Sequence, residues 1–546
     1  MPKPFKIRPE TLSALVALFI VIALNGTLWT KLYAVTSPDT VTDWAFLFSF
    51  FLFQVATYFF FLRLLSLRYV LKTVAALMVV TAAAASYFMG EYGAVIDMNM
   101  IRNVFQTDSA EAGDLVTWAA AAWVGGLGLA PALAIALVRI KWPAWKPLLR
   151  ANLTGCALAL AVVIANFAAF SNDYFSVLRE QQAIVFMSTP ANVVLAGGKL
   201  AVRSVRHYSG PLTPIGLDAQ RDQAPGSSVR PLVTILVIGE TARAENFSLF
   251  GYQRDTNPGL KAIPDLIAFP QVSSCGTDTG VSVPCMFSGL GRARYSLRAV
   301  QRNENLLDLV LRTGLDVTWV DNQGGCKGVC ARIPTVTLTQ SSDPRFCIEG
   351  ECHDEILLEG LEQRIASMTK GGVIVLHMMG SHGPAYFKRV PAAFARFKPV
   401  CETAQFSRCA RDEIVNAYDN TIAYTDHVLA SLVALLRETS GSGPDTMMLY
   451  VSDHGESLGE NGVYLHAMPY VIAPKQQTHV PMVMWLSPTA REALKVENDC
   501  LADLARAKAF SHDNLFHTVL GLHRIRTSVY DEGLDILKPC RNQRPT

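Results

Sequence analysis

Residues 232–240 read LVTILVIGE, a short, mostly apolar run that ends at a carboxylate. A short run rich in Val, Ile and Leu is typical of a strand that is buried on both faces of a parallel sheet. Similar runs follow at 315–320, 372–380, 446–452 and 480–486. Helical patterns separate these runs, at 304–312, 354–368 and 412–438. Strands that alternate with helices predict an α/β domain with a mainly parallel central sheet.

The part of the chain that precedes this domain has a different composition. The 546 residues are 50 % hydrophobic with a mean hydropathy of +0.25, which is high for a soluble protein. All eleven histidines lie at or after His207, and ten of the eleven cysteines lie at or after Cys275. The net charge of +2 gives no reason to expect a nucleic-acid partner. The chain therefore divides into two chemically distinct parts.

The first part contains five apolar runs of about 20 residues, the length that an α-helix needs to cross a bilayer core. They occupy 11–33, 43–62, 70–90, 117–138 and 151–171. Backbone groups in lipid must pair within the segment, so each run is predicted to be a membrane-spanning helix. A cleaved signal peptide is the alternative for the first run, but that run is too long and no small-residue cleavage site follows it.

Charges in the short loops predict the orientation in the membrane. Lys and Arg gather before the first run, between the second and third, and between the fourth and fifth, whereas loops 34–42 and 91–116 are mainly acidic. By the positive-inside rule the N-terminus is cytoplasmic, and the chain after residue 171 lies outside the cytoplasm. Residues 172–206 look amphipathic and residues 207–230 have a linker composition. The predicted domains are 1–171, 172–230 and 231–546.

The cysteines agree with an oxidising compartment, because ten of them fall in the predicted external domain. Their spacing suggests four local disulfides, Cys275–Cys285, Cys326–Cys330, Cys347–Cys352 and Cys401–Cys409. Cys500 and Cys540 are left over as a fifth candidate pair, and the sequence alone does not establish their connectivity. Cys156 is expected to be a packing residue of a membrane helix. Zinc ligation by cysteine is disfavoured because the short pairs lack histidine partners.

Acidic residues and histidines directly follow several predicted strands. Glu240, Asp321, His382 and the pair Asp453–His454 all stand in this position. In open α/β sheets the site lies beyond the carboxyl ends of the strands, where such side chains converge. Taken singly, a glutamate after a strand is more often a helix N-terminal charge, and a DHG sequence is more often a turn. Their joint placement predicts a metal site that suits zinc, with manganese as the alternative.

The segment CGTDTGVSVPC, residues 275–285, places a hydroxyl-rich loop between two cysteines. A hydroxyl beside a bound metal ion has a lowered pKa and can act as a nucleophile near neutral pH. A disulfide across the loop would hold that hydroxyl in position for attack. Thr277, Thr279 and Ser282 are the candidates, and spacing does not choose among them. The simpler alternative is a disulfide that only staples a surface loop.

Several motifs together resemble the lipid A phosphoethanolamine transferases, a family that includes the mobile colistin-resistance enzymes. These motifs are NVFQTD (103–108), GETAR (239–243), SSCGTDTGVSVPCMFS (273–288), GSHGP (380–384) and SDHGESLGENGVYLH (452–466). The resemblance runs the length of the chain. It implies five membrane helices followed by a sulfatase-like domain of the alkaline phosphatase superfamily, anchored in the bacterial inner membrane with the catalytic domain in the periplasm.

The resemblance also implies roles for individual residues. The family's nucleophile, the second threonine of its C-G-T-x-T loop, falls on Thr279, and its zinc ligands fall on Glu240, Thr279, Asp453 and His454. The resemblance implies one tightly bound Zn²⁺, with a second one as an option. The histidines that hold a second metal or the substrate phosphate, and that act as acid or base, fall on His382 and His466.

Substrate-binding positions can be carried over in the same way. Lys327, in GGCKGVC, falls where the family has a basic residue near the phosphate. Positions of the membrane domain that the family uses for substrate fall on Asn103, Thr107 and Glu111, whose spacing would put them on one helix face, although a solvated face has the same spacing. The loop departs from the family at Asp278 and Gly280, which is expected to change its surface more than the nucleophile.

The implied reaction is a transfer between two lipids. Thr279 would attack the phosphate of phosphatidylethanolamine and release diacylglycerol, and a phosphate of lipid A would then take the phosphoethanolamine from the threonine. The product surface is less anionic and binds polymyxin and other cationic peptides more weakly. The expected partners are these two lipids and the membrane itself, and the chain is expected to be a monomer.

Other functions share much of this chemistry. A phosphoglycerol transferase that uses manganese, or transfer of phosphoethanolamine to a core sugar or a protein, is the close alternative. A phosphatase would use the same metal and nucleophile with water as acceptor, and a sulfatase typically has a C-x-P-x-R motif, which this loop lacks. A catalytically inactive membrane sensor is disfavoured because all the expected ligands are present.

Overall fold

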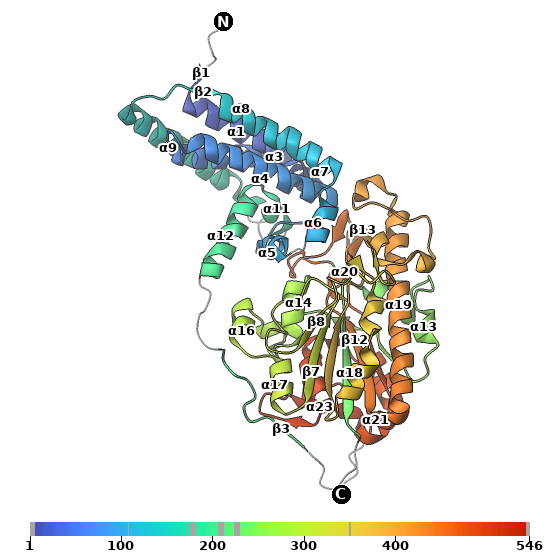
Figure 1. The fold of residues 1–546 in the computed structure, drawn as a ribbon. Coiled ribbons are helices and arrows are strands. Elements are labelled where there is room, and N and C mark those ends of the chain that lie inside the picture. Colours follow the sequence, from blue (N-terminus) through green and yellow to red (C-terminus); the bar gives the residue numbers. More distant parts are fainter. Residues whose placement is uncertain are drawn as a thin grey trace. The chain divides into compact units, whose positions relative to one another are not determined.

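The computed structural model describes residues 6–106, 109–171, 173–174, 182–205, 212–222, 230–348 and 351–541. The chain forms two compact units (Figure 1). The first consists of residues 1–105 and 115–206, and the second consists of residues 106–114 and 207–546. Each unit has its own hydrophobic core, so the two are described separately.

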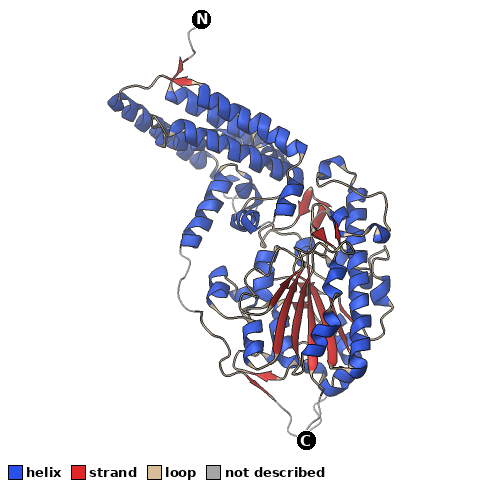
Figure 2. Ribbon diagram, viewed as in Figure 1, coloured by secondary structure: helices blue, strands red, loops and turns tan. Residues whose placement is uncertain are grey.

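The first unit is a set of long apolar helices, blue in Figure 2. Three single helices are long and apolar enough to cross a membrane, α3 (Val41–Leu64), α4 (Leu71–Tyr92) and α9 (Trp145–Ala169). A fourth span joins α7 (Trp118–Trp123), the π-helical η1 (Val124–Leu129) and α8 (Ala130–Leu137). Shorter helices of this unit are α5 (Met98–Gln106), α11 (Gln182–Met187) and α12 (Ala191–Val205). The last two lie in the segment that was expected to be amphipathic.

The sequence predicted one helix for the first apolar run, but the structure divides this run into two. It forms α1 (Pro9–Ala23) and α2 (Gly26–Thr36), which are bent by 60° at the break between them. At the break, the Asn25 amide donates to the carbonyl oxygens of Ile20 and Thr189, both at 2.9 Å, and accepts the N–H of Thr189 at 3.0 Å. A side chain that bonds to the backbone in this way competes with the helix ladder and allows the bend. Within the described residues, four helices are therefore long and apolar enough to cross a membrane, or five if the bent pair counts as one span.

The ends of this unit agree with the expected loop arrangement. The strands β1 (Lys6–Ile7) and β2 (Arg139–Ile140) pair in parallel, which brings the N-terminal segment beside the loop that precedes α9. Two of the three basic loops therefore lie at the same end of the helices, as the positive-inside rule requires of loops on one side of a membrane.

The second unit is built on a seven-stranded sheet, drawn as red arrows in Figure 2. The strands lie in the order β5 (Ile267–Phe269), β15 (Met482–Leu486), β12 (Asp445–Ser452), β4 (Leu232–Gly239), β11 (Gly372–His377), β7 (Asp316–Asp321) and β8 (Thr335–Thr337). Only β15 runs antiparallel to its neighbours, and every other pair is parallel. All residues of β4, β11 and β12 are buried, which explains why their sequences are mostly apolar. The predicted mainly parallel α/β domain is confirmed.

Helices cover both faces of this sheet (Figure 1). On one face, residues of β4, β11 and β12 share a hydrophobic core with α14 (Thr279–Met286), α17 (Leu306–Arg312) and α23 (Asp513–Leu522). The long helix α19 (Arg411–Ser442) packs on the other side, together with α18 (Leu361–Ser367). The helix expected at 354–368 is divided, because a 3₁₀ turn, η4 (Asp354–Leu358), precedes α18.

Part of the predicted linker is integrated into the second unit. Strand β3 (Gln220–Arg221) pairs antiparallel with β17 (Ile525–Arg526), and the N–H of Thr213 donates to the carbonyl of Arg302 at 2.7 Å. Residues 206–211 and 223–229 of that segment lie outside the described residues. Residues 212–222 therefore pack against the second unit and are not a free connection between the two units.

Ten cysteines form five disulfides, all in the second unit. The four local pairs are Cys275–Cys285, Cys326–Cys330, Cys347–Cys352 and Cys401–Cys409, as their spacing suggested. The fifth joins Cys500 in α22 (Asn498–Ala507) to Cys540 in η9 (Lys538–Cys540) and ties the C-terminal segment to the domain. Cys156 in α9 is a free thiol.

Removing the long-range disulfide is expected to destabilise the second unit more than removing a short-range one. Cys500–Cys540 spans 40 residues and should contribute about 4 kcal/mol by restricting the unfolded chain. Cys347–Cys352 spans 5 residues and should contribute about 2 kcal/mol. We therefore expect a larger loss of thermal stability in Cys500→Ser/Cys540→Ser than in Cys347→Ser/Cys352→Ser, measured by circular dichroism on the full chain in detergent. Equal losses would contradict this account.

Candidate active site

Three buried ligating side chains meet at the carboxyl ends of two neighbouring strands. Glu240 follows β4, and Asp453 and His454 follow β12, which lies beside β4 in the sheet. All three residues are 0 % exposed, and one ligand atom from each lies within 4.8 Å of the others. The Nε2 atom of His454 is 3.3 Å from Glu240 Oε1 and 3.4 Å from Asp453 Oδ2. The structure thus brings together the three side chains that the sequence placed at strand ends.

Of the three candidate hydroxyls, the one of Thr279 faces this cluster. Its Oγ1 atom lies 3.1 Å from Glu240 Oε2 and 3.5 Å from His454 Nε2. Thr279 is the first residue of α14, and the Asp278 carboxylate caps this helix by accepting the N–H of Val281 at 3.1 Å. The N-terminus of a helix favours negative charge, part of which the Asp278 carboxylate supplies here.

The other two hydroxyls stabilise the loop itself. Thr277 Oγ1 donates to the carbonyl of Met468 at 2.6 Å, and Ser282 Oγ accepts the N–H of Gly276 at 3.0 Å. The geometry therefore distinguishes among hydroxyls that spacing left equivalent.

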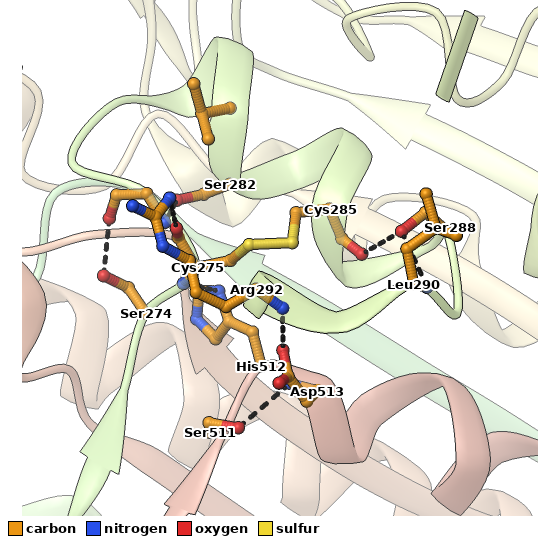
Figure 3. Close-up of a disulfide and its surroundings, with 12 residues drawn as sticks. Ser274, Cys275, Ser282, Cys285, Ser288, Leu290, Arg292, Ser511, His512 and Asp513 are labelled. Carbon is orange, nitrogen blue, oxygen red and sulfur yellow. Dashed lines mark hydrogen bonds between the residues drawn. A yellow bond between two sulfur atoms is a disulfide. The ribbon is translucent and has the colours of Figure 1, made fainter. Parts of the chain in front are cut away.

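The start of the loop is fixed at Cys275 from several sides, as Figure 3 shows. Its sulfur bonds to Cys285, its N–H donates to His512 Nδ1 at 3.1 Å, and its carbonyl accepts from the Arg292 guanidinium at 2.6 Å. The same guanidinium lies over the ring of Tyr470, 3.7 Å from its centroid. The loop is thus rooted in the domain rather than stapled at the surface.

Thr241 links the two carboxylates and was missed by sequence reasoning. Its Oγ1 donates to Glu240 Oε1 at 2.5 Å, and its N–H donates to Asp453 Oδ1 at 3.1 Å. Thr241 has φ of +60°, a left-handed conformation that a β-branched residue rarely adopts. The hydroxyl of Tyr418 donates a hydrogen bond to the Thr241 carbonyl at 2.8 Å. Strain of this kind is typical of functional sites. Its position next to Glu240 in GETAR was the one signal in the sequence.

The two further histidines lie beside the cluster. The ring of His466 is 4.4 Å from that of His454, and the ring of His382 is 5.8 Å from that of His466, centroid to centroid. His466 Nδ1 is also 3.4 Å from Glu456 Oε2. Glu456 is fully buried, and burial raises its pKa to about 8. Sequence reasoning missed Glu456 although it stands two residues after His454.

The electrostatics of the cluster fit a bound cation. Burial opposes the charged form of His454, but Asp453 and Glu240 raise its pKa to about 10. Burial and the neighbouring Glu240 raise the pKa of Asp453. Two buried carboxylates therefore draw positive charge toward one point.

The donor atoms also fit a metal ion. Asp453 Oδ2 accepts no hydrogen bond from the described residues. His454 Nδ1 lies 2.9 Å from the carbonyl of Gly455, so Nδ1 carries the hydrogen and Nε2 faces the carboxylates. Two carboxylates, an imidazole nitrogen and a nearby hydroxyl are a donor set that suits zinc.

The predicted substrate-binding roles of Lys327, Asn103, Thr107 and Glu111 remain predictions. Lys327 lies in the Cys326–Cys330 loop, where its ammonium donates to the carbonyl of Gly324 at 2.9 Å. Asn103 is in α5, Thr107 lies outside the described residues, and Glu111 is in α6 (Ser109–Leu115), where its side chain is not described.

Asp321 ends its strand as expected but has a different neighbour. Its Oδ1 atom lies 2.8 Å from His377 Nδ1 and accepts the indole N–H of Trp319 at 3.0 Å. Asp321 thus pairs with a histidine of the adjacent strand β11 rather than with Glu240 or Asp453.

Two family models match the chain. Residues 54–205 match the model described as phosphoethanolamine transferase EptA/EptB, and residues 233–525 match the sulfatase model. Phosphoethanolamine transferase EptA of Escherichia coli K12 is 42 % identical over 88 % of this chain and 87 % of its own. Phosphatidylethanolamine transferase Mcr-1 of Escherichia coli is 38 % identical over 84 % of each chain.

A solved structure matches nearly the whole length. The integral membrane protein lipooligosaccharide phosphoethanolamine transferase A from Neisseria meningitidis superposes with a TM-score of 0.95 at 36 % identity. The match covers 98 % of this chain and 100 % of that one. The chain therefore belongs to the lipid A phosphoethanolamine transferase family, with a membrane-spanning unit and a sulfatase-type catalytic domain.

Proposed function

We propose that the chain transfers phosphoethanolamine from phosphatidylethanolamine to a phosphate of lipid A through a covalent intermediate on Thr279. The observation that carries this proposal is the 3.1 Å distance between the Thr279 hydroxyl and the buried carboxylate of Glu240. A hydroxyl at this distance from a ligand cluster, on a loop fixed by a disulfide, is suited to nucleophilic attack.

Glu240, Thr279, Asp453 and His454 would hold one Zn²⁺, with His382 and His466 available to a second metal or to the substrate phosphate. When bound, zinc supplies positive charge that lowers the pKa of an adjacent hydroxyl and offsets charge on a reacting phosphate. The fit of the donor set and the unpartnered Asp453 oxygen support this assignment.

The first step needs a threonine oxygen that has lost its proton. Glu240 accepts the Thr279 hydroxyl, and the N-terminus of α14 favours negative charge on that oxygen. The oxygen attacks the phosphorus of phosphatidylethanolamine, a P–O bond forms, and the P–O bond to diacylglycerol breaks. The proton lost by the threonine goes to the diacylglycerol oxygen. Phosphoethanolamine remains as a phosphodiester on Thr279.

The second step reverses the roles of the two oxygens. A phosphate oxygen of lipid A attacks the same phosphorus, and the bond to Thr279 breaks, so the threonine regains a proton. His466 lies beside His454 with its side chain 17 % exposed, and His382 lies beside His466, which suits these histidines to move protons for incoming and leaving groups. The product carries a positive ethanolamine charge next to a phosphate.

The architecture supports two lipid substrates, because the catalytic domain is continuous with a unit of membrane-spanning helices. The basic loops favour a cytoplasmic N-terminus in a bacterial inner membrane, and five disulfides favour a periplasmic catalytic domain. Transfer at this surface lowers its negative charge, and cationic peptides such as polymyxin then bind more weakly.

Incubating the full chain with phosphatidylethanolamine and no acceptor should leave a phosphoethanolamine mass increment on Thr279. Peptide mass spectrometry over residues 275–285 measures this. Thr279→Ala should remove the increment, whereas Thr279→Ser, which keeps a hydroxyl, should retain it at a lower rate. Prior chelation of metal should also prevent it. Consumption of the donor with an unmodified Thr279 would overturn the covalent mechanism.

Glu240→Gln should lower zinc affinity by more than about 100-fold, because changes to mere partners of metal ligands already cost 10- to 100-fold. Zinc content after dialysis, measured by elemental mass spectrometry, tests this without reference to activity. Glu245→Gln is the matched control, since this nearby carboxylate is partly exposed and pairs with Lys475. Full zinc content in Glu240→Gln would remove Glu240 from the ligand set.

Expression in a polymyxin-sensitive Gram-negative strain should raise the polymyxin concentration needed to stop growth. Lipid A extracted from these cells should carry phosphoethanolamine, as measured by mass spectrometry. Cells that express Thr279→Ala to the same level should show neither change. Unmodified lipid A in resistant cells would point to another acceptor.

A further inference from the structure

A buried histidine connects the loop of Thr279 to the strand that carries the metal-site residues. His512, 2 % exposed, stands directly before α23. Its Nδ1 atom accepts the N–H of Cys275 at 3.1 Å (Figure 3). Its Nε2 atom is 2.9 Å from the carbonyl oxygen of Ser452. Cys275 lies four residues before Thr279, and Ser452 directly precedes Asp453.

The two backbone partners determine the form of this imidazole. A backbone N–H can only donate and a carbonyl oxygen can only accept, so Nδ1 bears the lone pair and Nε2 bears the hydrogen. The ring is therefore neutral. Burial also lowers the pKa of His512 to about 4, which agrees with a neutral ring at neutral pH.

The connection is short and rigid. The N–H of His512 donates to the carbonyl of Ser273 at 3.0 Å, which anchors the histidine to the same loop through its own backbone. Ser452 Oγ accepts the N–H of Ala242 at 2.8 Å and donates to the carbonyl of His454 at 3.0 Å. One imidazole thus joins the nucleophile loop to a strand end that Asp453 and His454 directly follow.

We propose that His512 is a positioning residue for phosphoethanolamine transfer, which sets the distance between Thr279 and the Glu240–Asp453–His454 cluster by bridging the backbones of Cys275 and Ser452. This inference rests on the proposed role of Thr279. His512 contacts neither the cluster nor the reacting oxygen, so it acts through the loop and the strand.

The same helix offers a matched control at its other end. His523 directly follows α23, is 3 % exposed, and has Nε2 3.0 Å from Thr234 Oγ1 on β4. Thr234 precedes Glu240 by six residues, or about 20 Å along an extended strand. His523 is therefore a buried histidine of the same helix, bound to the central sheet but remote from the cluster.

Two substitutions of His512 separate its two bonds. In His512→Asn the amide oxygen can replace Nδ1 and keep the Cys275 bond, whereas the bond to Ser452 is lost. In His512→Gln the amide nitrogen can replace Nε2 and keep the Ser452 bond, whereas the bond to Cys275 is lost. Bridging requires both bonds, so both variants should be impaired.

The experiment measures the single-turnover rate of Thr279 labelling by phosphatidylethanolamine in the zinc-loaded full chain, with zinc content and thermal stability for each variant. Both His512 variants should label about 10- to 100-fold more slowly at saturating donor, the cost of a small misplacement of a reacting group. Their zinc content and the donor concentration for half-maximal rate should be unchanged. His523→Gln should lose comparable thermal stability and label at the wild-type rate.

Each other outcome overturns the proposal. Wild-type labelling rates in either His512 variant would show that the bridge is dispensable. Equal slowing in His523→Gln would assign the effect to general stability, and loss of zinc from the His512 variants would assign it to metal retention. A wild-type chain that takes no label on Thr279 would overturn the proposed function itself, and is distinguished by the wild-type reference in the same experiment.

Discussion

The pairing of β4 with β12 is the constraint on which the site depends. These strands are parallel neighbours in register, with Gly239 opposite Ser452, and the N–H of Asp453 donates to the carbonyl of Gly239 at 2.9 Å. Glu240 and Asp453 therefore leave the sheet at the same level. Two carboxylates buried side by side are costly unless positive charge compensates them. A divalent cation held by both carboxylates and by the neutral imidazole of His454 would supply that charge.

The surroundings of the cluster hold this unfavourable arrangement in place. Thr241 gives one hydrogen bond to each carboxylate from a strained backbone conformation. The nucleophile loop is fixed by a disulfide, by Arg292 and by His512, so that the Thr279 hydroxyl is presented without further ordering. Because the loop is already ordered in the folded protein, its ordering costs no entropy during the reaction. That entropy is lost on folding instead, where burial of the hydrophobic core of the second unit offsets the cost.

Sequence reasoning succeeded where local pattern and burial coincide. The run LVTILVIG matches β4 residue for residue, because a strand covered on both faces is mostly apolar and stands out from the polar sequence around it. Glu240, Asp453 and His454 could be identified from the sequence for the same reason, since each stands at the end of such a run. The antiparallel direction of β15 could not be predicted, because an apolar run does not indicate in which direction its strand runs in the sheet.

Features that depend on contacts between residues far apart in the chain could not be predicted from the sequence either. The bend at Asn25 depends on the backbone of Thr189, and His512 bonds to Cys275 across 237 positions of the chain. The strand in residues 212–222 exists because β17 supplies its partner from the far end of the chain. In each case the side chain or segment is polar and unremarkable until the fold places its partner.

The central claim is that transfer proceeds in two steps through the oxygen of Thr279. The most direct test is the configuration at phosphorus, with phosphatidylethanolamine made chiral at that atom by one sulfur substitution and with lipid A as acceptor. Each in-line displacement inverts the phosphorus, so two successive displacements give a product of retained configuration, which is the result that this account predicts. Inversion would mean that lipid A attacks the donor directly and would contradict the intermediate on Thr279.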